Sequence, residues 1–299
     1  MTTRQAIRSS IMHASTILGA VWAASAAVAS PIVERAAASA LTPHNDFSCT
    51  SSKHPNPVVV LHGLGATYYE DINALEAFLK SKQYCTFSIT YGEFVEEFPY
   101  VGGLEPIAES AKDIGDFVKQ VASAYGTEVD LVGHSEGAFQ TLYVPKFEDG
   151  VKEVVRKVFA IAPPSHGTTF ASLYTLSYLG GNLTNNLVQA VLDVGCPACT
   201  DLVTNGSAVE MLNDGPVAQE GIEYTILASK YDELITPTER AFVREQGVRN
   251  IYVQDFCPLD FVGHIGESYD LNVWTLVDNT LSGSTAGPKT CAPGPLVGK

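Results

Sequence analysis

Basic residues are scarce in this sequence. It has 18 Lys and Arg against 33 Asp and Glu, which gives a formal net charge of −15. Nucleic acids and anionic membrane surfaces are bound by clustered Lys and Arg, so this composition argues against both kinds of partner. Charged residues make up only 17% of the chain and hydrophobic residues 45%, which excludes a disordered chain and suffices for a substantial core.

The hydrophobic run near the N-terminus is too short to span a membrane comfortably. It covers residues 17–28 and is rich in alanine. Arg4 and Arg8 precede it, and Ala27-Val28-Ala29 fits the small-x-small pattern of a cleavage site. We therefore predict a secretory signal peptide over residues 1–29 and an extracellular protein with no transmembrane span. An N-terminal membrane anchor is the alternative.

Cysteines are few, and their number is even. In a secreted chain this predicts disulfides, although the count alone leaves the pairing open. Sequence order favours the local pairs Cys49–Cys85, Cys196–Cys199 and Cys257–Cys291. The second pair forms a C-x-x-C motif, which elsewhere can bind zinc or carry redox chemistry. This chain has no second C-x-x-C and no nearby histidine to complete a zinc site, and no βαβ unit begins there to suggest a redox site. A structural disulfide is therefore preferred. Two sequons in the same region predict N-glycosylation at Asn182 and Asn205.

Apolar runs that suit strands alternate along the chain with amphipathic segments that suit helices. We predict strands at residues 58–61, 86–90, 129–132, 154–162, 224–229 and 250–254. We predict helices over residues 71–80, from Glu105-Pro106 onward, over 138–143 and around Trp274. This alternation predicts the α/β class, with a mainly parallel sheet and helices on both faces.

Neither an internal repeat nor a linker divides the chain. We expect one domain over residues 45–292, preceded at 30–44 by a pro-segment or a disordered N-terminus. A flexible tail should follow at 293–299. Residues 170–214 form an apolar insertion, for which a lid over the site and ordinary core helices are both open interpretations.

Gly133-His134-Ser135-Glu136-Gly137 is a G-x-S-x-G pentapeptide between a predicted strand and a predicted helix. That context is the sequence form of a nucleophile elbow, a sharp turn that presents a serine. The glycines are needed because side chains there would collide with the neighbouring strand and helix. The pentapeptide alone recurs by chance, so the prediction depends on the rest of the chain.

A serine nucleophile needs a general base, and the base needs a third group to orient it. In an α/β-hydrolase the chain order is Ser, then Asp or Glu, then His. Only His166 and His264 follow Ser135. His166 comes directly after the next predicted strand and leaves almost no room for an acid. His264 is therefore the predicted base.

The acid should follow the predicted strand at residues 224–229. Asp232 comes first after that strand and is the predicted acid, with Glu233 as the alternative. Asp255 and Asp260 lie too near His264 in the sequence to occupy a separate loop.

Backbone N–H groups should stabilise the negative oxygen that forms during acyl transfer. We predict one donor at Glu136, directly after the serine and at the start of a helix. The other is Leu64 in His62-Gly63-Leu64-Gly65, a glycine-rich loop after a buried strand. Glycines let this backbone approach the substrate oxygen closely.

These motifs resemble the small secreted lipases and esterases of the α/β-hydrolase superfamily, above all the actinomycete-type triacylglycerol lipases and their fungal counterparts. The resemblance covers roughly residues 55–277 and includes four segments, which are 58–65, 133–137, 231–237 and 257–264. It implies a six-stranded parallel sheet, three disulfides, hydrolysis of carboxylic esters, and neither a cofactor nor a metal. Many such lipases have Met or Gln after the nucleophile, whereas this chain has Glu136.

The predicted function is therefore that of a secreted, monomeric serine ester hydrolase, a triacylglycerol lipase in the first instance. Its partner would be a lipid or another ester, with contact at a lipid interface. The same residues would also suit a cutinase or polyester hydrolase, a short-chain esterase or an acyltransferase. A non-hydrolytic binding protein on the same scaffold is the alternative from another class, disfavoured because Ser135, Asp232 and His264 are all present.

Overall fold

The computed structural model describes residues 44–93, 101–169, 196–292 and 294. The predicted signal peptide, residues 30–43, residues 170–195 of the predicted insertion, and the predicted tail apart from Gly294 lie outside the described residues. Within the described ranges, no helix is both long enough and apolar enough to cross a membrane.

The described strands form one fully parallel sheet in the order β2-β1-β3-β4-β5-β6. The strands are β1 (Val58–Leu61), β2 (Thr86–Phe87), β3 (Val129–His134), β4 (Val155–Ile161), β5 (Glu223–Ala228) and β6 (Val248–Tyr252). The predicted α/β class and parallel sheet are therefore confirmed, with six strands in one sheet.

α-Helices lie between successive strands from β1 to β5, and a last helix follows β6. They are α2 (Asn73–Ser81), α3 (Ile107–Tyr125), α4 (Glu136–Phe147), α7 (Pro197–Leu202), α8 (Ser207–Asn213) and α9 (Leu271–Leu281). A π-helical turn, η1 (Tyr68–Ile72), leads into α2. Short 3₁₀ turns are η2 (Lys152–Val154), η3 (Thr238–Ala241), η4 (Val253–Asp255) and η5 (Ile265–Tyr269).

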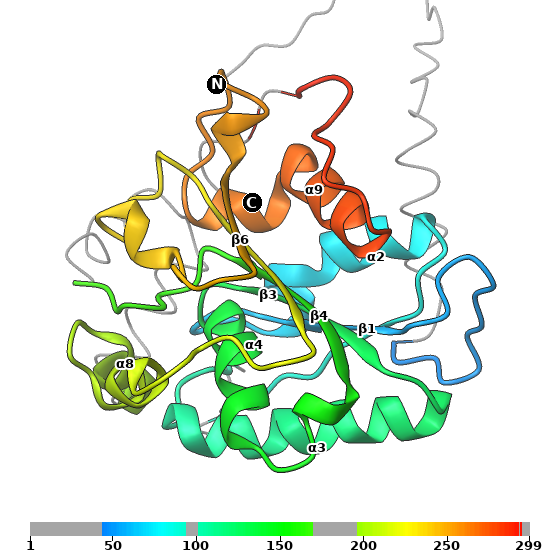
Figure 1. The fold of residues 1–299 in the computed structure, drawn as a ribbon, viewed down its shortest axis with the longest axis horizontal. Helices are drawn as coiled ribbons and strands as arrows, with labels where there is room; N and C mark the ends of the chain where they lie inside the picture. Colours follow the sequence, from blue (N-terminus) through cyan, green and yellow to red (C-terminus); the bar gives the residue numbers. More distant parts are fainter. Residues whose placement is uncertain (1–43, 94–100, 170–195, 293, 295–299) are drawn as a thin grey trace, which may run out of the picture.

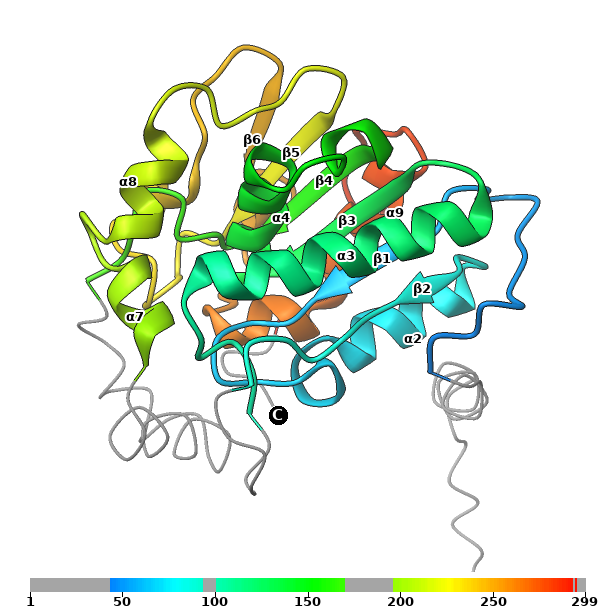
Figure 2. The same cartoon turned by 90° about the horizontal axis from the view of Figure 1, so that it is seen from below.

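The sheet lies between two helical layers, with α3 and α4 on one side and α2 and α9 on the other (Figures 1 and 2). Successive side chains of a strand point to opposite faces. Val59 and Leu61 of β1 therefore pack in the core under α3 and α4, while Val58 and Val60 pack in the core under α2 and α9. This double burial explains why the strands read as continuous apolar runs.

Several predicted boundaries, among them those of β2, β6, α2 and α4, differ from the observed ones, and side chains from elsewhere explain two of the differences. β2 ends at Phe87 instead of residue 90, because the N–H of Ser88 donates to the Asn45 side chain rather than to a neighbouring strand. The helix predicted from Asp71 starts as α2 at Asn73, because Thr67 caps the preceding turn η1 by accepting the N–H of Tyr69.

The disulfides join Cys49 to Cys85, Cys196 to Cys199, and Cys257 to Cys291, so the predicted local pairing is confirmed. The first pair ties the N-terminal loop to the residue before β2. The second closes the first turn of α7, and the third fastens the C-terminal segment to the loop after β6.

Candidate active site

Ser135 occupies the sharp turn between β3 and α4. Its backbone has φ 55° and ψ −116°, a strained conformation for a residue with a side chain. A Cβ built on Gly133 would overlap the backbone of Gly137, and one built on Gly137 would overlap the carbonyls of Leu61 and His62. The two glycines of the pentapeptide are thus required for the close approach of the turn to α4 and β1.

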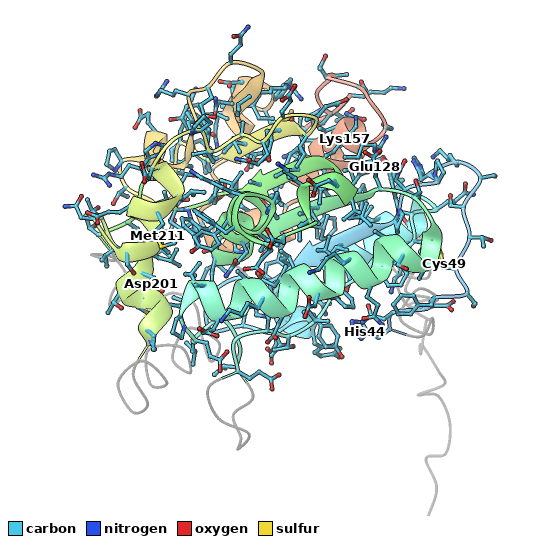
Figure 3. All side chains as sticks on the ribbon, turned by 60° about the horizontal axis from the view of Figure 1, so that its bottom comes forward. His44, Cys49, Glu128, Lys157, Asp201 and Met211 are labelled. Atoms are coloured by element: carbon cyan, nitrogen blue, oxygen red, sulfur yellow. A yellow bond between two sulfur atoms is a disulfide. The ribbon has the colours of Figure 1, made fainter. Side chains whose placement is uncertain are left out.

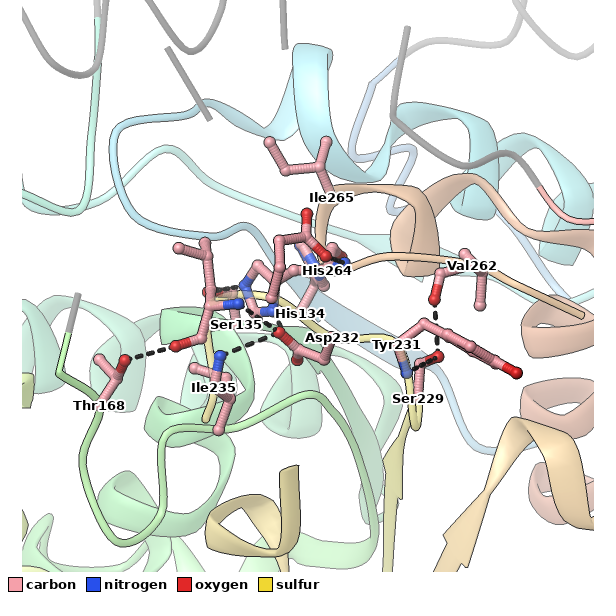
Figure 4. Close-up of polar contacts among 12 residues, drawn as sticks. His134, Ser135, Thr168, Ser229, Tyr231, Asp232, Ile235, Val262, His264 and Ile265 are labelled. Carbon is pink, nitrogen blue, oxygen red and sulfur yellow. Dashed lines mark hydrogen bonds and ion pairs between the residues drawn. The ribbon is translucent and has the colours of Figure 1, made fainter. Parts of the chain in front are cut away.

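The structure brings Ser135, His264 and Asp232 together in one hydrogen-bonded row (Figure 4). His264 Nε2 lies 2.8 Å from Ser135 Oγ, and His264 Nδ1 lies 2.8 Å from Asp232 Oδ2. Ser135 follows β3, Asp232 follows β5 and His264 follows β6. Because the strands are parallel, these positions meet at one edge of the sheet. His264 and Asp232 are buried, whereas Ser135 is partly accessible.

Asp232, and not Glu233, faces the imidazole of His264. The second oxygen of Asp232, Oδ1, accepts the N–H groups of Leu234 and Ile235, at 2.8 and 2.9 Å, which fixes the carboxylate. Glu233 instead accepts the backbone N–H of His264 at 3.0 Å. The two neighbouring carboxylates therefore hold the ring and the backbone of the same histidine.

The other residues weighed for these positions lie elsewhere. Asp255 accepts the N–H of Tyr252. Asp260 accepts the N–H of Val262 and the side-chain amide of Asn272. His166 is exposed, with its Nδ1 3.1 Å from the carbonyl of Arg240.

The glycine-rich loop after β1 lies against Ser135. A Cβ on Gly63 would come 3.2 Å from Ser135 Cβ and 3.3 Å from Asp71 Oδ2. The N–H of Gly63 donates to Asp71 Oδ2 at 2.7 Å. Among the described residues, no acceptor takes the N–H of Leu64 or of Glu136. Within the described ranges, the N–H groups of both predicted donors are thus left without a protein acceptor.

Two further buried histidines flank this loop, and their surroundings differ. The ring of His62 has a carbonyl acceptor at Nδ1, 2.8 Å from Gly63 O, and receives the N–H of Tyr91 at Nε2. One donor and one acceptor suit a neutral imidazole, and burial lowers the pKa of His62 to about 4. His134 instead faces acceptors at both nitrogens, which are the Asp71 carboxylate and the His264 carbonyl.

Glu136 and Glu267 are fully buried carboxyl groups for which the described residues offer no hydrogen-bond partner. Burial raises the pKa of Glu136 well above its ordinary value, and the charge of Asp201 adds to this. Burial also raises the pKa of Glu267, as do the nearby charges of Asp232, Glu233 and Asp270. Both shifts therefore favour the neutral acid form of these two groups.

Asp232, His264 and Glu267 are the described residues that together offer the donor atoms for a cation, since one such atom from each lies within 4.8 Å of the others. Their present geometry is one of hydrogen bonding, because His264 Nδ1 and Asp232 Oδ2 lie 2.8 Å apart, a distance at which the two atoms share a proton. A cation would require the imidazole to give up its bond to Asp232.

The predicted insertion is described only from residue 196, where it forms α7 and α8. Figure 3 shows Asp201 at the end where α3 begins, and its Oδ2 accepts the N–H of Ile107 at 3.0 Å. Residues 170–195 of the segment, for which a lid and core helices are both open interpretations, lie outside the described residues.

Sequence reasoning assigned no role to Asp71, His134 or Glu267. His134 lies inside the pentapeptide and Asp71 eight residues after Gly63, but no local pattern links the two. Of the predicted glycosylation sites, Asn205 is exposed between α7 and α8, and Asn182 lies outside the described residues.

Aspergillus fumigatus lipase B superposes with a TM-score of 0.64 at 17% identity, over 85% of this chain and 60% of that one. The propeptide form of the Bacillus licheniformis lipase BlEst2 gives 0.52 at 16% identity, over 84% and 55%. The chain therefore spans less than two thirds of either structure, and likeness at these identities shows the fold alone.

Comparison with curated proteins gives no match. The family model for class 2 lipases matches residues 55–268. This range begins before β1, ends within η5, and includes the elbow and the loops that carry Asp232 and His264. The chain belongs to the class 2 lipase family.

Proposed function

We propose that this protein is a serine carboxylic-ester hydrolase that acts on acylglycerols, a triacylglycerol lipase working through Ser135, His264 and Asp232. The observation that carries the proposal is the continuous row of contacts from Ser135 Oγ through His264 to Asp232, with both distances at 2.8 Å. The strained backbone of Ser135 and the free N–H groups beside it support the same chemistry.

Ser135 Oγ attacks the carbonyl carbon of the ester while His264 Nε2 takes the hydroxyl proton. Asp232 accepts a hydrogen bond from the Nδ1–H of His264, so that Nε2 carries the lone pair needed for this transfer. The imidazolium that forms is then stabilised by the Asp232 carboxylate. Its proton passes to the departing alcohol, which leaves an acyl group on Ser135.

The N–H groups of Leu64 and Glu136 bind the negative oxygen of each tetrahedral intermediate. Water then attacks the acyl-enzyme, giving its proton to His264, and the carboxylic acid leaves as Ser135 regains the proton. The raised pKa of Glu136, which favours the uncharged acid, suits this step, because a buried negative charge beside the developing oxyanion would oppose it.

The proposal of a lipid substrate is supported by similarity to lipases. The matching family is that of class 2 lipases, and the two similar solved structures are those of proteins named as lipases. Three disulfides and the predicted signal peptide support an extracellular enzyme, for which we also propose glycosylation at Asn205 and a monomeric state. A cutinase, a short-chain esterase and an acyltransferase would use the same residues.

The test is Ser135→Ala, assayed with p-nitrophenyl esters of increasing chain length. We expect a loss of kcat of about 10⁴-fold or more, because removing the nucleophile of a serine hydrolase has effects of this order. The matched control is Ser81→Ala, at an exposed serine of α2, which should keep full activity. Near wild-type turnover by Ser135→Ala would remove Ser135 from the mechanism.

A second measurement addresses the substrate. Wild-type enzyme is compared on soluble short-chain esters, emulsified triglyceride and a polyester film. Release of fatty acid from the emulsion is expected. Hydrolysis of short soluble esters alone would leave an ester hydrolase but refute the triacylglycerol lipase.

A further inference from the structure

Asp71 and His134 form a second carboxylate–imidazole pair directly behind Ser135. His134 Nδ1 lies 3.0 Å from each oxygen of Asp71, and His134 Nε2 lies 3.0 Å from the backbone carbonyl oxygen of His264. The side chains are only 4% and 6% exposed. Solvent therefore cannot substitute for either contact.

The proton count of this arrangement is informative. A neutral imidazole has one N–H donor and one acceptor nitrogen, whereas an imidazolium donates from both. A backbone carbonyl only accepts, and an ionised carboxylate only accepts. With Asp71 ionised, both contacts of His134 are satisfied at once only if its ring carries two protons and a positive charge.

The hydrogen bonds of Asp71 support its ionised form. Its Oδ2 also accepts the N–H of Gly63 at 2.7 Å, so the carboxylate has donors on more than one side. Burial works to raise the pKa of Asp71, but the charge of His134 and the bonds from His134 and Gly63 outweigh it and leave the pKa below its ordinary value. Burial lowers the pKa of His134, and Asp71 more than offsets this.

We propose that His134 is held as an imidazolium and that the Asp71–His134 ion pair is a positioning device for the active site. It links three loops. The glycine-rich loop after β1 is bound through the Gly63 N–H, the turn at Ser135 through His134 itself, and the loop that carries His264 through the His264 carbonyl. The inference deepens the proposed function and rests on it. Neither residue touches the reacting atoms, so both act through Ser135, Leu64 and His264.

The physical reason for such a device is the placement of the loops. They follow different strands, and they pack closely, since a Cβ built on Gly63 would lie only 3.2 Å from Ser135 Cβ. A buried ion pair whose remaining donors and acceptors are all satisfied is costly to break, because each charge would then be left uncompensated. The pair therefore resists small shifts of the loops, which would reduce kcat more than they change KM.

The pair also predicts an alkaline limit of activity. The charged and titratable groups that surround it are Asp232 and the ring of His264, at 5.2 Å between centroids, together with His62, Glu70 and Tyr269 around Asp71. Because the folded pKa of His134 is raised, its contribution is present below its unfolded pKa and is lost as pH rises through the folded value. Deprotonation would turn a lone pair toward one of the two acceptors.

The first experiment reads the charge directly. Wild-type protein labelled with ¹⁵N-histidine is studied by NMR at about pH 7.5, a value at which an ordinary histidine is mostly neutral. The signals of His134 are assigned by their loss in His134→Gln. We expect both ring nitrogens of His134 to be protonated, whereas His62 shows one protonated and one unprotonated nitrogen. An unprotonated nitrogen on His134 would overturn the proposal.

The second experiment measures kinetics of Asp71→Asn, His134→Gln and the double variant on a soluble p-nitrophenyl ester. We expect kcat to fall by about 10²-fold in each single variant with KM changed by less than about 3-fold. The double variant should resemble the single ones, because each single substitution already abolishes the Asp71–His134 ion pair. The alkaline limb of the wild-type kcat profile should disappear in all three.

The matched control is Glu76→Gln. Glu76 is also a buried carboxyl group, but it lies in α2, accepts a hydrogen bond from Ser88 and is outside the site. It should lower Tm at unchanged kcat. If the Asp71 and His134 variants behaved in the same way, the pair would be a stabilising contact only and the proposal would be wrong. Failure of the proposed function is separate, because it would appear as activity in Ser135→Ala while the NMR result for His134 stood.

Discussion

Four carboxyl groups are buried around Ser135, and they fall into two kinds. Asp71 and Asp232 each face the imidazole of a histidine. Glu136 and Glu267 are just as buried, but no described residue bonds to either carboxyl. The difference shows that burial alone does not decide whether a carboxyl group at this site carries a charge. The neighbouring imidazole decides it.

The energetics explain this division. Moving a carboxylate out of water is so unfavourable that an unpaired group takes up a proton instead. An imidazolium, or an imidazole N–H together with backbone donors, offsets the desolvation and keeps the carboxylate ionised. Asp71, whose pKa is lowered, and Glu136, whose pKa is raised, show the two outcomes most clearly.

The largest expected effect comes from removing charge at a paired position. In Asp232→Asn, the amide would still occupy the space, but its NH₂ group could face His264 Nδ1 and favour the wrong tautomer. We expect kcat to fall by about 10⁴-fold, with KM and Tm little changed, since the same substitution in a serine protease triad has an effect of this size. Steady-state kinetics and thermal unfolding measure this.

The matched variant is Glu267→Gln. It also replaces a buried carboxyl group by an amide, but at a position where no described residue bonds to the carboxyl. Because that group is already neutral, kcat should stay within about 5-fold of the wild-type value. Equal losses in the two variants would contradict the division of the carboxyl groups.

Local patterns and chain order accounted for much of this architecture. The apolar runs located all six strands, and the order of Ser135, Asp232 and His264 predicted residues that the structure indeed brings together. Their chemical roles stay predictions. The pair of Asp71 and His134 could not be found in this way, because 63 residues separate the two and neither belongs to a motif for the other.

The same limit applies to the ends of elements. The end of β2 at Phe87 depends on the side chain of Asn45, which reaches the strand from a separate segment. The neutrality of Glu136 likewise depends on packing by residues such as Gly103, where a Cβ would lie 2.5 Å from Glu136 Oε2. Contacts of this kind exist only after the chain has folded.

A smaller effect is expected in the pH dependence of stability. The folded pKa of Glu267 is raised well above its ordinary value of 4.5, so above that pH the unfolded chain loses a proton that the folded one keeps. Stability of the wild type should therefore fall with rising pH, by up to about 1.4 kcal/mol per pH unit from this group until its folded pKa is reached. Glu267→Gln lacks this contribution.

Urea unfolding at about pH 5 and pH 8 compares the two proteins across that window. The stability of Glu267→Gln relative to wild type should increase from the lower pH to the higher one. Glu109→Gln, at an exposed carboxyl of α3, serves as the control and should show no such trend. A stability difference that did not change with pH would mean that Glu267 is ionised in the folded protein.

The smallest expected effect is that of Glu136→Gln on activity. The predicted oxyanion donor at this position is the backbone N–H, which the substitution leaves in place, and glutamine has nearly the size and the neutral charge of the protonated acid. We therefore expect kcat within about 3-fold of wild type on a soluble ester at neutral pH. A loss of about 10²-fold or more would show that the carboxyl itself takes part, as an ionised group or as a proton donor. Glu136 would then belong with Asp71 and Asp232, and the division between paired and unpaired carboxyl groups would fail at the residue nearest to Ser135.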